Sequence, residues 1–161
     1  MDGDTPMADE KETTTGIGSD IRPCEIFIDK EGQWFYKGAE MHRREIVRFF
    51  YEHLSLDGGG RYILEWAGER CLLEAEDTAF VVKRVAFDGG FFLSLSDDSV
   101  EKLAPDTLYV GDGNVLYCLV HGAFPARFTR PAYYQLAAYI EEEDGAFVLP
   151  VGANRYPIKM R

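Results

Sequence analysis

The two halves of the sequence present the same landmarks in the same order, one copy from about Ile26 to Glu74 and the other from about Leu108 to Arg161. In each copy a strand pattern leads through an acidic Gly turn into an aromatic-rich strand. An Arg then opens an apolar-patterned helix, and an Asp-Gly pair precedes a closing hairpin. The paired landmarks are Arg43 and Arg130, Asp57 and Asp144, and Gly32 and Gly113. The first two pairs are 87 residues apart and the third is 81 apart, so we expect six extra residues in the second copy.

Hydrophobic spacing predicts the elements within this repeat. Residues 43–54 carry Ile46, Val47 and Phe50 at helical spacing, and a second helix is predicted from Arg130 to about Glu143. Residues 79–96 read as two strands joined by an Asp-Gly-Gly turn. The links between successive predicted strands are too short for parallel crossovers, which favours antiparallel pairing. We therefore predict an α+β fold, mainly antiparallel strands with two helices, built from two related hairpin–helix–hairpin units.

The composition changes after the first twenty residues, which contain six acidic residues, one Lys and few large apolar side chains. Such a segment cannot bury enough surface to offset its ordering entropy. We predict a disordered acidic tail at 1–20, a first α+β unit with following strands at 21–96, and a second unit at 97–161 packed on the first.

The charge and the apolar runs exclude some classes of function. The formal net charge is −11, and the body remains acidic without the tail, which argues against nucleic-acid binding. No apolar run approaches the roughly 20 residues of a membrane span, and no secretory signal is evident.

The three cysteines, Cys24, Cys71 and Cys118, are odd in number and lack C-x-x-C spacing. This pattern favours reduced thiols over a disulfide framework or a zinc site. We therefore expect a cytoplasmic protein.

Arginines crowd the start of the first helix, where the helix dipole disfavours cations. Arg43, Arg44 and Arg48 lie there, and Arg130 takes the equivalent place in the second copy. Because both copies use Arg, a repeated structural clamp is the first interpretation, and a site for a carboxylate or phosphate is the second. For that second interpretation the candidate ligand-binding residues are Arg43, Arg48 and Arg130.

Three adjacent aromatic residues, Trp34, Phe35 and Tyr36, must split between the two faces of a strand. Core packing is the first interpretation, and an exposed remainder would form a recognition surface. Trp34 therefore joins the candidate ligand-binding residues.

The sequence carries no recognisable catalytic or metal-binding pattern. No two of the histidines, His42, His53 and His121, share a metal-ligand spacing, so we assign no catalytic residue, metal or cofactor. The competing hypothesis is an enzyme whose active site forms only in the fold. Its suspects are Glu76, Asp77 and one histidine.

Several blocks of the sequence resemble an uncharacterised bacterial family, domain of unknown function 1285 (DUF1285). The blocks are Pro23-Cys24, IDKEGQWFYKG, Arg43 with Ile46 to Phe50, LLEAEDTAFVV and FPARFTRPAYYQLAAYIEEEDG. Arg44 stands where that family usually has Pro. The resemblance implies an α+β fold of two related units and a suggested role in signalling or regulation. It supplies no catalytic residues.

Together these observations favour a non-catalytic ligand- or partner-binding module with a groove between its two units. A small anionic ligand or a protein partner would bind there, near Arg43, Arg48 and Arg130. A structural subunit that forms a homodimer through exposed aromatics is a further alternative.

Overall fold

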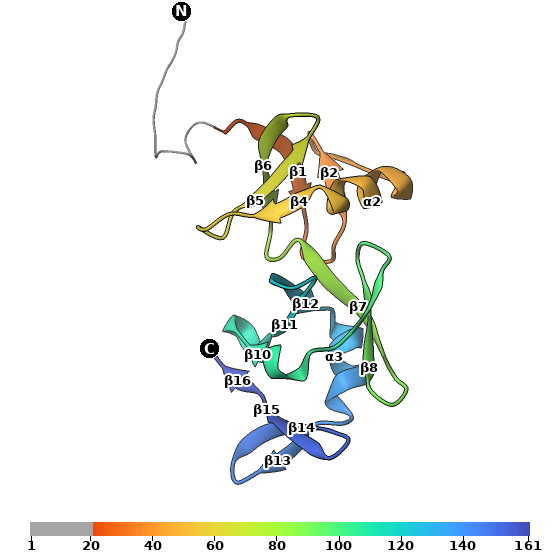
Figure 1. The fold of residues 1–161 in the computed structure, drawn as a ribbon, viewed down its shortest axis with the longest axis vertical. Coiled ribbons are helices and arrows are strands. Elements are labelled where there is room, and N and C mark those ends of the chain that lie inside the picture. Colours follow the sequence, from red (N-terminus) through yellow and green to blue (C-terminus); the bar gives the residue numbers. More distant parts are fainter. Residues whose placement is uncertain (1–20) are drawn as a thin grey trace, which may run out of the picture.

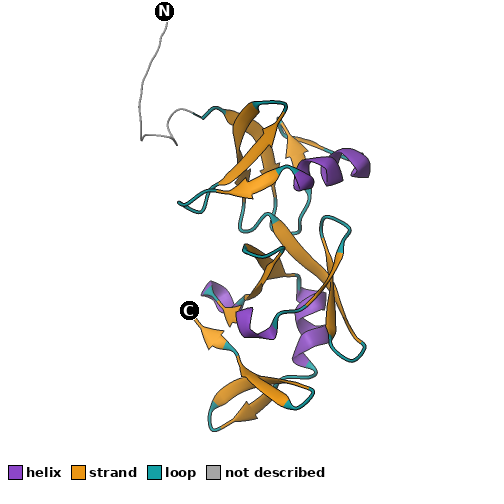
Figure 2. Ribbon diagram, in the orientation of Figure 1, coloured by secondary structure: helices purple, strands orange, loops and turns teal. Residues whose placement is uncertain are grey.

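The computed structural model describes residues 21–161, so the predicted disordered tail at 1–20 lies outside the described residues. Within 21–161 the chain forms sixteen strands, two α-helices and two short 3₁₀ helices. The strands form an upper and a lower body in Figure 1, and each body has its own α-helix. Strand is the dominant element of secondary structure (Figure 2). The predicted α+β class is confirmed.

The first unit is a six-stranded sheet in the order β3-β2-β1-β6-β5-β4. The helix α2 (Arg44–Glu52) connects β3 to β4 and buries Val47 and Tyr51. The strands are β1 (Pro23–Ile28), β2 (Trp34–Tyr36), β3 (Ala39–Glu40), β4 (Leu54–Leu56), β5 (Tyr62–Trp66) and β6 (Glu69–Ala75).

The second unit holds a seven-stranded sheet, β16-β10-β11-β12-β7-β8-β9, and a three-stranded sheet, β13-β14-β15. The helix α3 (Arg130–Ala137) packs against β7 and β12 and buries Ala132 and Leu136. The seven strands of the larger sheet are β7 (Phe80–Phe87), β8 (Phe91–Leu95), β9 (Val100–Lys102), β10 (Tyr109–Val110), β11 (Leu116–Val120), β12 (Phe124–Phe128) and β16 (Lys159–Met160). The remaining elements are η1 (Pro105–Thr107), η2 (Asp112–Asn114), β13 (Glu141–Glu143), β14 (Ala146–Val151) and β15 (Asn154–Pro157).

The division between the sheets falls earlier in the chain than the predicted boundary at residue 96. The strands β7 and β8 were expected to follow the first unit, but β7 pairs in parallel with β12 of the second. The first sheet ends at Ala75, and the second begins at Phe80. Residues 76–79 therefore connect the two units.

The two halves share a connectivity. β1 pairs antiparallel with β2 and parallel with β6, and β10 pairs antiparallel with β11 and parallel with β16. In each half an antiparallel hairpin follows the helix, β4–β5 in one and β13–β14 in the other. The surroundings differ, because β12 pairs with β7 and the second half is split into two sheets. A common origin of the halves remains a prediction.

Both helices are shorter than predicted, for the same reason. The first ends at Glu52 and the second at Ala137, and a short strand, β4 or β13, lies between each helix and its Asp-Gly turn. Asp57 and Gly58 therefore lie in the turn from β4 to β5 and not at the end of the helix. A strand of three residues gives too short a pattern to separate from a helix end by periodicity.

The sheets are mainly antiparallel, as predicted, but the short links did not exclude parallel pairs. Three parallel pairs occur among the described strands, namely β1 with β6, β10 with β16, and β12 with β7. None of them uses a short link, because each joins strands that many intervening residues separate. Short links exclude parallel pairing only between consecutive strands.

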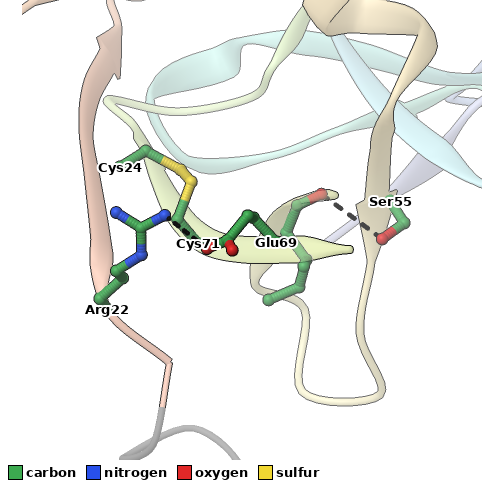
Figure 3. The surroundings of a disulfide bond; sticks show 6 residues. Arg22, Cys24, Ser55, Glu69 and Cys71 are labelled. Carbon is green, nitrogen blue, oxygen red and sulfur yellow. Dashed lines mark hydrogen bonds and ion pairs between the residues drawn. A yellow bond between two sulfur atoms is a disulfide. The ribbon is translucent and has the colours of Figure 1, made fainter. Parts of the chain in front are cut away.

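The prediction of reduced cysteines was wrong for two of the three. Cys24 and Cys71 form a disulfide with a Cα–Cα distance of 5.0 Å, which links β1 to β6 (Figure 3). Beside it, Arg22 donates a hydrogen bond to Glu69 over 3.1 Å. Sequence spacing could not reveal this bond, because the parallel pairing of β1 and β6 brings the two residues together. Cys118 is free and buried.

The disulfide removes the argument that led from reduced thiols to the cytoplasm, and that location remains a prediction. In the described part of the chain, no helix has the length and apolar character needed to cross a membrane.

Candidate functional site

A cavity of about 370 Å³ lies where the two units meet. The first unit contributes the β1–β2 turn and the first residue of α2. The second unit contributes β7 and the β8–β9 hairpin. The lining residues are Gly32, Gln33, Arg44, Lys83, Arg84, Ser94, Leu95, Ser96, Asp98, Ser99 and Val100.

The cavity is cationic although the protein is acidic. Arg44, Lys83 and Arg84 line it, and Asp98 is the single carboxylate in the lining. Lys83 donates to the backbone carbonyl of Glu31 over 3.0 Å. The guanidinium of Arg84 has no hydrogen bond or ion pair to any residue in 21–161, which leaves it available to a ligand.

Asp98 organises the arginines at the rim. Arg44 lies 3.1 Å from Asp98 and Arg48 lies 3.3 Å from it. Arg44 also donates to the backbone carbonyl of Ser96 over 2.8 Å. Because these pairs are partly exposed to solvent, each contributes little to stability, and a competing anion could replace Asp98 at little cost.

The floor of the cavity is closely packed. Gly32 has φ +86°, and a Cβ placed on it would lie 3.0 Å from Cβ of Ser96. The hydroxyl of Ser96 lies 2.9 Å from that of Tyr51 and accepts a hydrogen bond from the backbone N–H of Val81. Burial raises the pKa of Tyr51 to about 12, so its hydroxyl stays neutral at physiological pH. The two units therefore pack closely against each other beside the cavity.

The four predicted ligand-binding residues do not line one common cavity. Arg43 pairs with Glu45 at 3.0 Å and does not line the cavity, whereas Arg48 reaches its rim through Asp98. Arg130 lines a different cavity, on the second unit. Trp34 is 1% exposed and packs edge-on against Tyr51, so it is a core residue that a ligand in these cavities cannot contact.

Sequence reasoning missed Lys83 and Arg84. Both lie on β7, and a charged residue on an outer strand position is ordinarily solvated surface. Arg44 was part of the basic cluster but was not chosen. Its place in a cluster of arginines was a signal that could have selected it. No local feature of the sequence indicates that the β7 residues line a cavity.

The suspected catalytic residues do not assemble. Asp77 accepts hydrogen bonds from Tyr117 at 2.6 Å and Arg127 at 2.7 Å. Glu76 accepts one from the backbone of Lys30. Within residues 21–161 no hydrogen bond or ion pair joins either carboxylate to a histidine.

A separate cluster gathers around His121, which sequence spacing did not reveal. Its Nε2 lies 3.0 Å from Asp97 and its Nδ1 lies 3.3 Å from Glu101. Ser99 donates its hydroxyl proton to Asp97 over 2.6 Å. The hydroxyl oxygen of Ser99 also lies 3.4 Å from Nε2 of His121, a longer contact than the one it makes with Asp97. Among the described residues no group of His, Cys, Asp and Glu could hold a metal ion.

Comparison with solved structures identifies two proteins with this fold. A DUF1285 family protein from Silicibacter pomeroyi DSS-3 aligns with a TM-score of 0.72 and 21% identity, covering 85% of this chain and 80% of that one. A DUF1285 family protein from Shewanella baltica OS155 aligns with a TM-score of 0.62 and 17% identity, covering 72% of this chain and 91% of that one. None of the curated proteins matches the chain significantly.

A family match falls on the first unit. Residues 19–78 match the domain of unknown function DUF1285, N-terminal domain. The end of this match falls in the connection between β6 and β7, where the first sheet ends. The N-terminal unit thus matches the DUF1285 N-terminal domain, and most of the chain shares its fold with two DUF1285 family proteins.

Proposed function

We propose that this protein is a non-catalytic regulatory module that binds a small polyvalent anion in the cavity between its two units. The observation that carries the proposal is that Arg44, Lys83 and Arg84 line this cavity with only one carboxylate among them. Arg44 comes from the first unit, whereas the other two come from the second. A ligand that touches all three bridges the units.

The chemistry of the cations favours phosphate or carboxylate groups. Guanidinium groups present several N–H donors in a plane, which suits two oxygens of one anion. Arg84 has no acceptor in residues 21–161, and Arg44 holds a partly exposed aspartate that an incoming anion replaces. A volume of about 370 Å³ is within the range of small-molecule sites.

The position of the cavity supports a regulatory role. A ligand held by both units binds best when they are docked, so its binding favours that arrangement. By linkage, a ligand at about 100 times its dissociation constant stabilises the folded state by about 2.7 kcal/mol. Signalling partners and a cytoplasmic location belong to this proposal as expectations.

Thermal unfolding with inorganic pyrophosphate at low ionic strength tests the proposal. Pyrophosphate should raise the melting temperature of the wild-type protein, and Arg84→Gln should remove most of that rise. The matched control is Arg70→Gln, which removes the same charge from an exposed position on β6, away from the cavity. The control variant should respond as the wild type does.

The proposal fails if pyrophosphate does not stabilise the wild-type protein. It also fails if Arg84→Gln and Arg70→Gln reduce the stabilisation equally, since that result would reflect net charge alone.

A further inference from the structure

A second hollow lies on the second unit. It consists of two contiguous cavities of about 580 Å³ and 330 Å³, which share Asn114, Leu116 and Tyr133 in their linings. Neither cavity shares a lining residue with the cavity between the units. This hollow is therefore a separate candidate site.

The larger cavity is predominantly apolar. Leu116 and Ile158 form buried parts of its wall, and Ile140 of the segment after α3 also lines it. Phe147 and Met160 line it while remaining 50% and 65% exposed. Large apolar side chains left in water around a concave surface are typical of a binding site.

The smaller cavity carries positive charge. Arg127 and Arg130 line it, and no acidic side chain of the described chain does so. Arg127 is committed to Asp77 at 2.7 Å. Arg130, at the start of α3, has no hydrogen-bond or ion-pair partner within residues 21–161, so its charge is available.

We propose that this hollow binds an amphiphile with one anionic head group and an unbranched apolar tail, such as a long-chain carboxylate. The head group pairs with Arg130 in the smaller cavity, and the tail lies along Leu116, Ile140 and Phe147 in the larger one. The reverse orientation is disfavoured because Glu142 lines the larger cavity. A small anion would leave the apolar wall in water, and a neutral hydrocarbon would leave Arg130 without a partner.

A chain-length series measured by isothermal titration calorimetry tests the tail. Octanoate, decanoate and dodecanoate are titrated into the wild-type protein below their micelle concentrations. Each added methylene group that becomes buried should raise the affinity about fourfold. Affinity that does not change from eight to twelve carbons would overturn the proposal.

Charge substitution tests the head group. Arg130→Gln should weaken dodecanoate binding about tenfold, as expected for the loss of a charge-assisted hydrogen bond. It should leave the affinity for the neutral dodecanol nearly unchanged. Arg130 is exposed, so the variant is expected to fold, and its melting temperature without ligand verifies this. Equal losses for dodecanoate and dodecanol would contradict a carboxylate at Arg130.

The control variant is Arg84→Gln, in the cavity between the units, which should bind dodecanoate as the wild type does. The pyrophosphate measurement tests the cavity between the units and the dodecanoate measurement tests the hollow, so either proposal can fail without the other. A second copy of the chain is the alternative occupant of the hollow, and sedimentation velocity tests it by measuring the oligomeric state. A dimer that dissociates in Phe147→Ala would identify this surface as a contact between two copies and would overturn the amphiphile proposal.

Discussion

The hydroxyl of Tyr51 on α2 donates a hydrogen bond to the backbone carbonyl of Ala79 over 2.8 Å. Ala79 lies in the connection between the two sheets, just before β7. The same hydroxyl lies 2.9 Å from that of Ser96, the residue after β8. One buried side chain of the first unit therefore contacts both the connection between the units and a residue of the second unit.

Tyr51→Phe should destabilise the protein by about 1–3 kcal/mol, because it leaves the buried carbonyl of Ala79 without a donor. Urea unfolding measures the change. Tyr36→Phe is the control, since Tyr36 is exposed and its hydroxyl has no hydrogen bond to any residue in 21–161. An equal, small effect in both variants would show that the Tyr51 hydroxyl does not hold the units together.

Removal of the disulfide between Cys24 and Cys71 should cost about 4 kcal/mol. The bond closes a loop with a sequence separation of 47, and a cross-link of this length restricts the unfolded chain by about that amount. The measurement is urea unfolding of the wild-type protein with and without a reducing agent. The double variant with both cysteines changed to Ser should be insensitive to the reductant. A wild-type protein that is equally stable in both conditions would contradict the prediction.

Gly32→Ala should be more costly than Gly68→Ala, although both positions have a positive φ, +86° and +79°. A Cβ at Gly68 meets no atom within 4 Å, so that variant measures the backbone strain alone, about 1–2 kcal/mol. At Gly32 the added carbon also meets Ser96 at 3.0 Å, which should add about 1–3 kcal/mol. Denaturant unfolding of both variants gives the difference. If the two variants were equally stable, the contact at the floor of the cavity would not be tight.

Stability should decrease as the pH rises from about 10 toward 12. Burial raises the pKa of Tyr51 to about 12; burial, followed by the hydrogen bond to Asp77, raises the pKa of Tyr117 to about 12. In the unfolded chain tyrosine ionises near pH 10, so the unfolded state loses its protons first and becomes favoured as the pH rises. The contribution is fully present below pH 10 and is lost as the pH approaches the pKa of the folded state.

Urea unfolding across this pH range measures the slope, which should be shallower in Tyr117→Phe. An unchanged slope in that variant would assign the alkaline loss of stability to other groups. Cys118 is one such group, since burial raises its pKa to about 12.

Local chemistry accounts for the parts of the fold that the sequence predicted. The start of α2, the hairpin β5–β6 and the hairpin β7–β8 follow from apolar spacing and from turns rich in Gly. These signals depend only on a few neighbouring residues, so they can be recognised without knowing where the segment lies in the fold. The ends of the helices were missed because β4 and β13 are too short to impose a period of their own.

The sequence by itself determined the α+β class, the two helices and the order of hairpins, because each depends on neighbours along the chain. Tertiary structure alone decided that Cys24 meets Cys71, that Asp77 binds Arg127 instead of a histidine, and that Arg44 faces the same cavity as Lys83 and Arg84. Each of these meetings joins residues on segments far apart in the sequence. Such contacts depend on the order in which strands pair and on the docking of the two units, and no periodicity in a single segment encodes either.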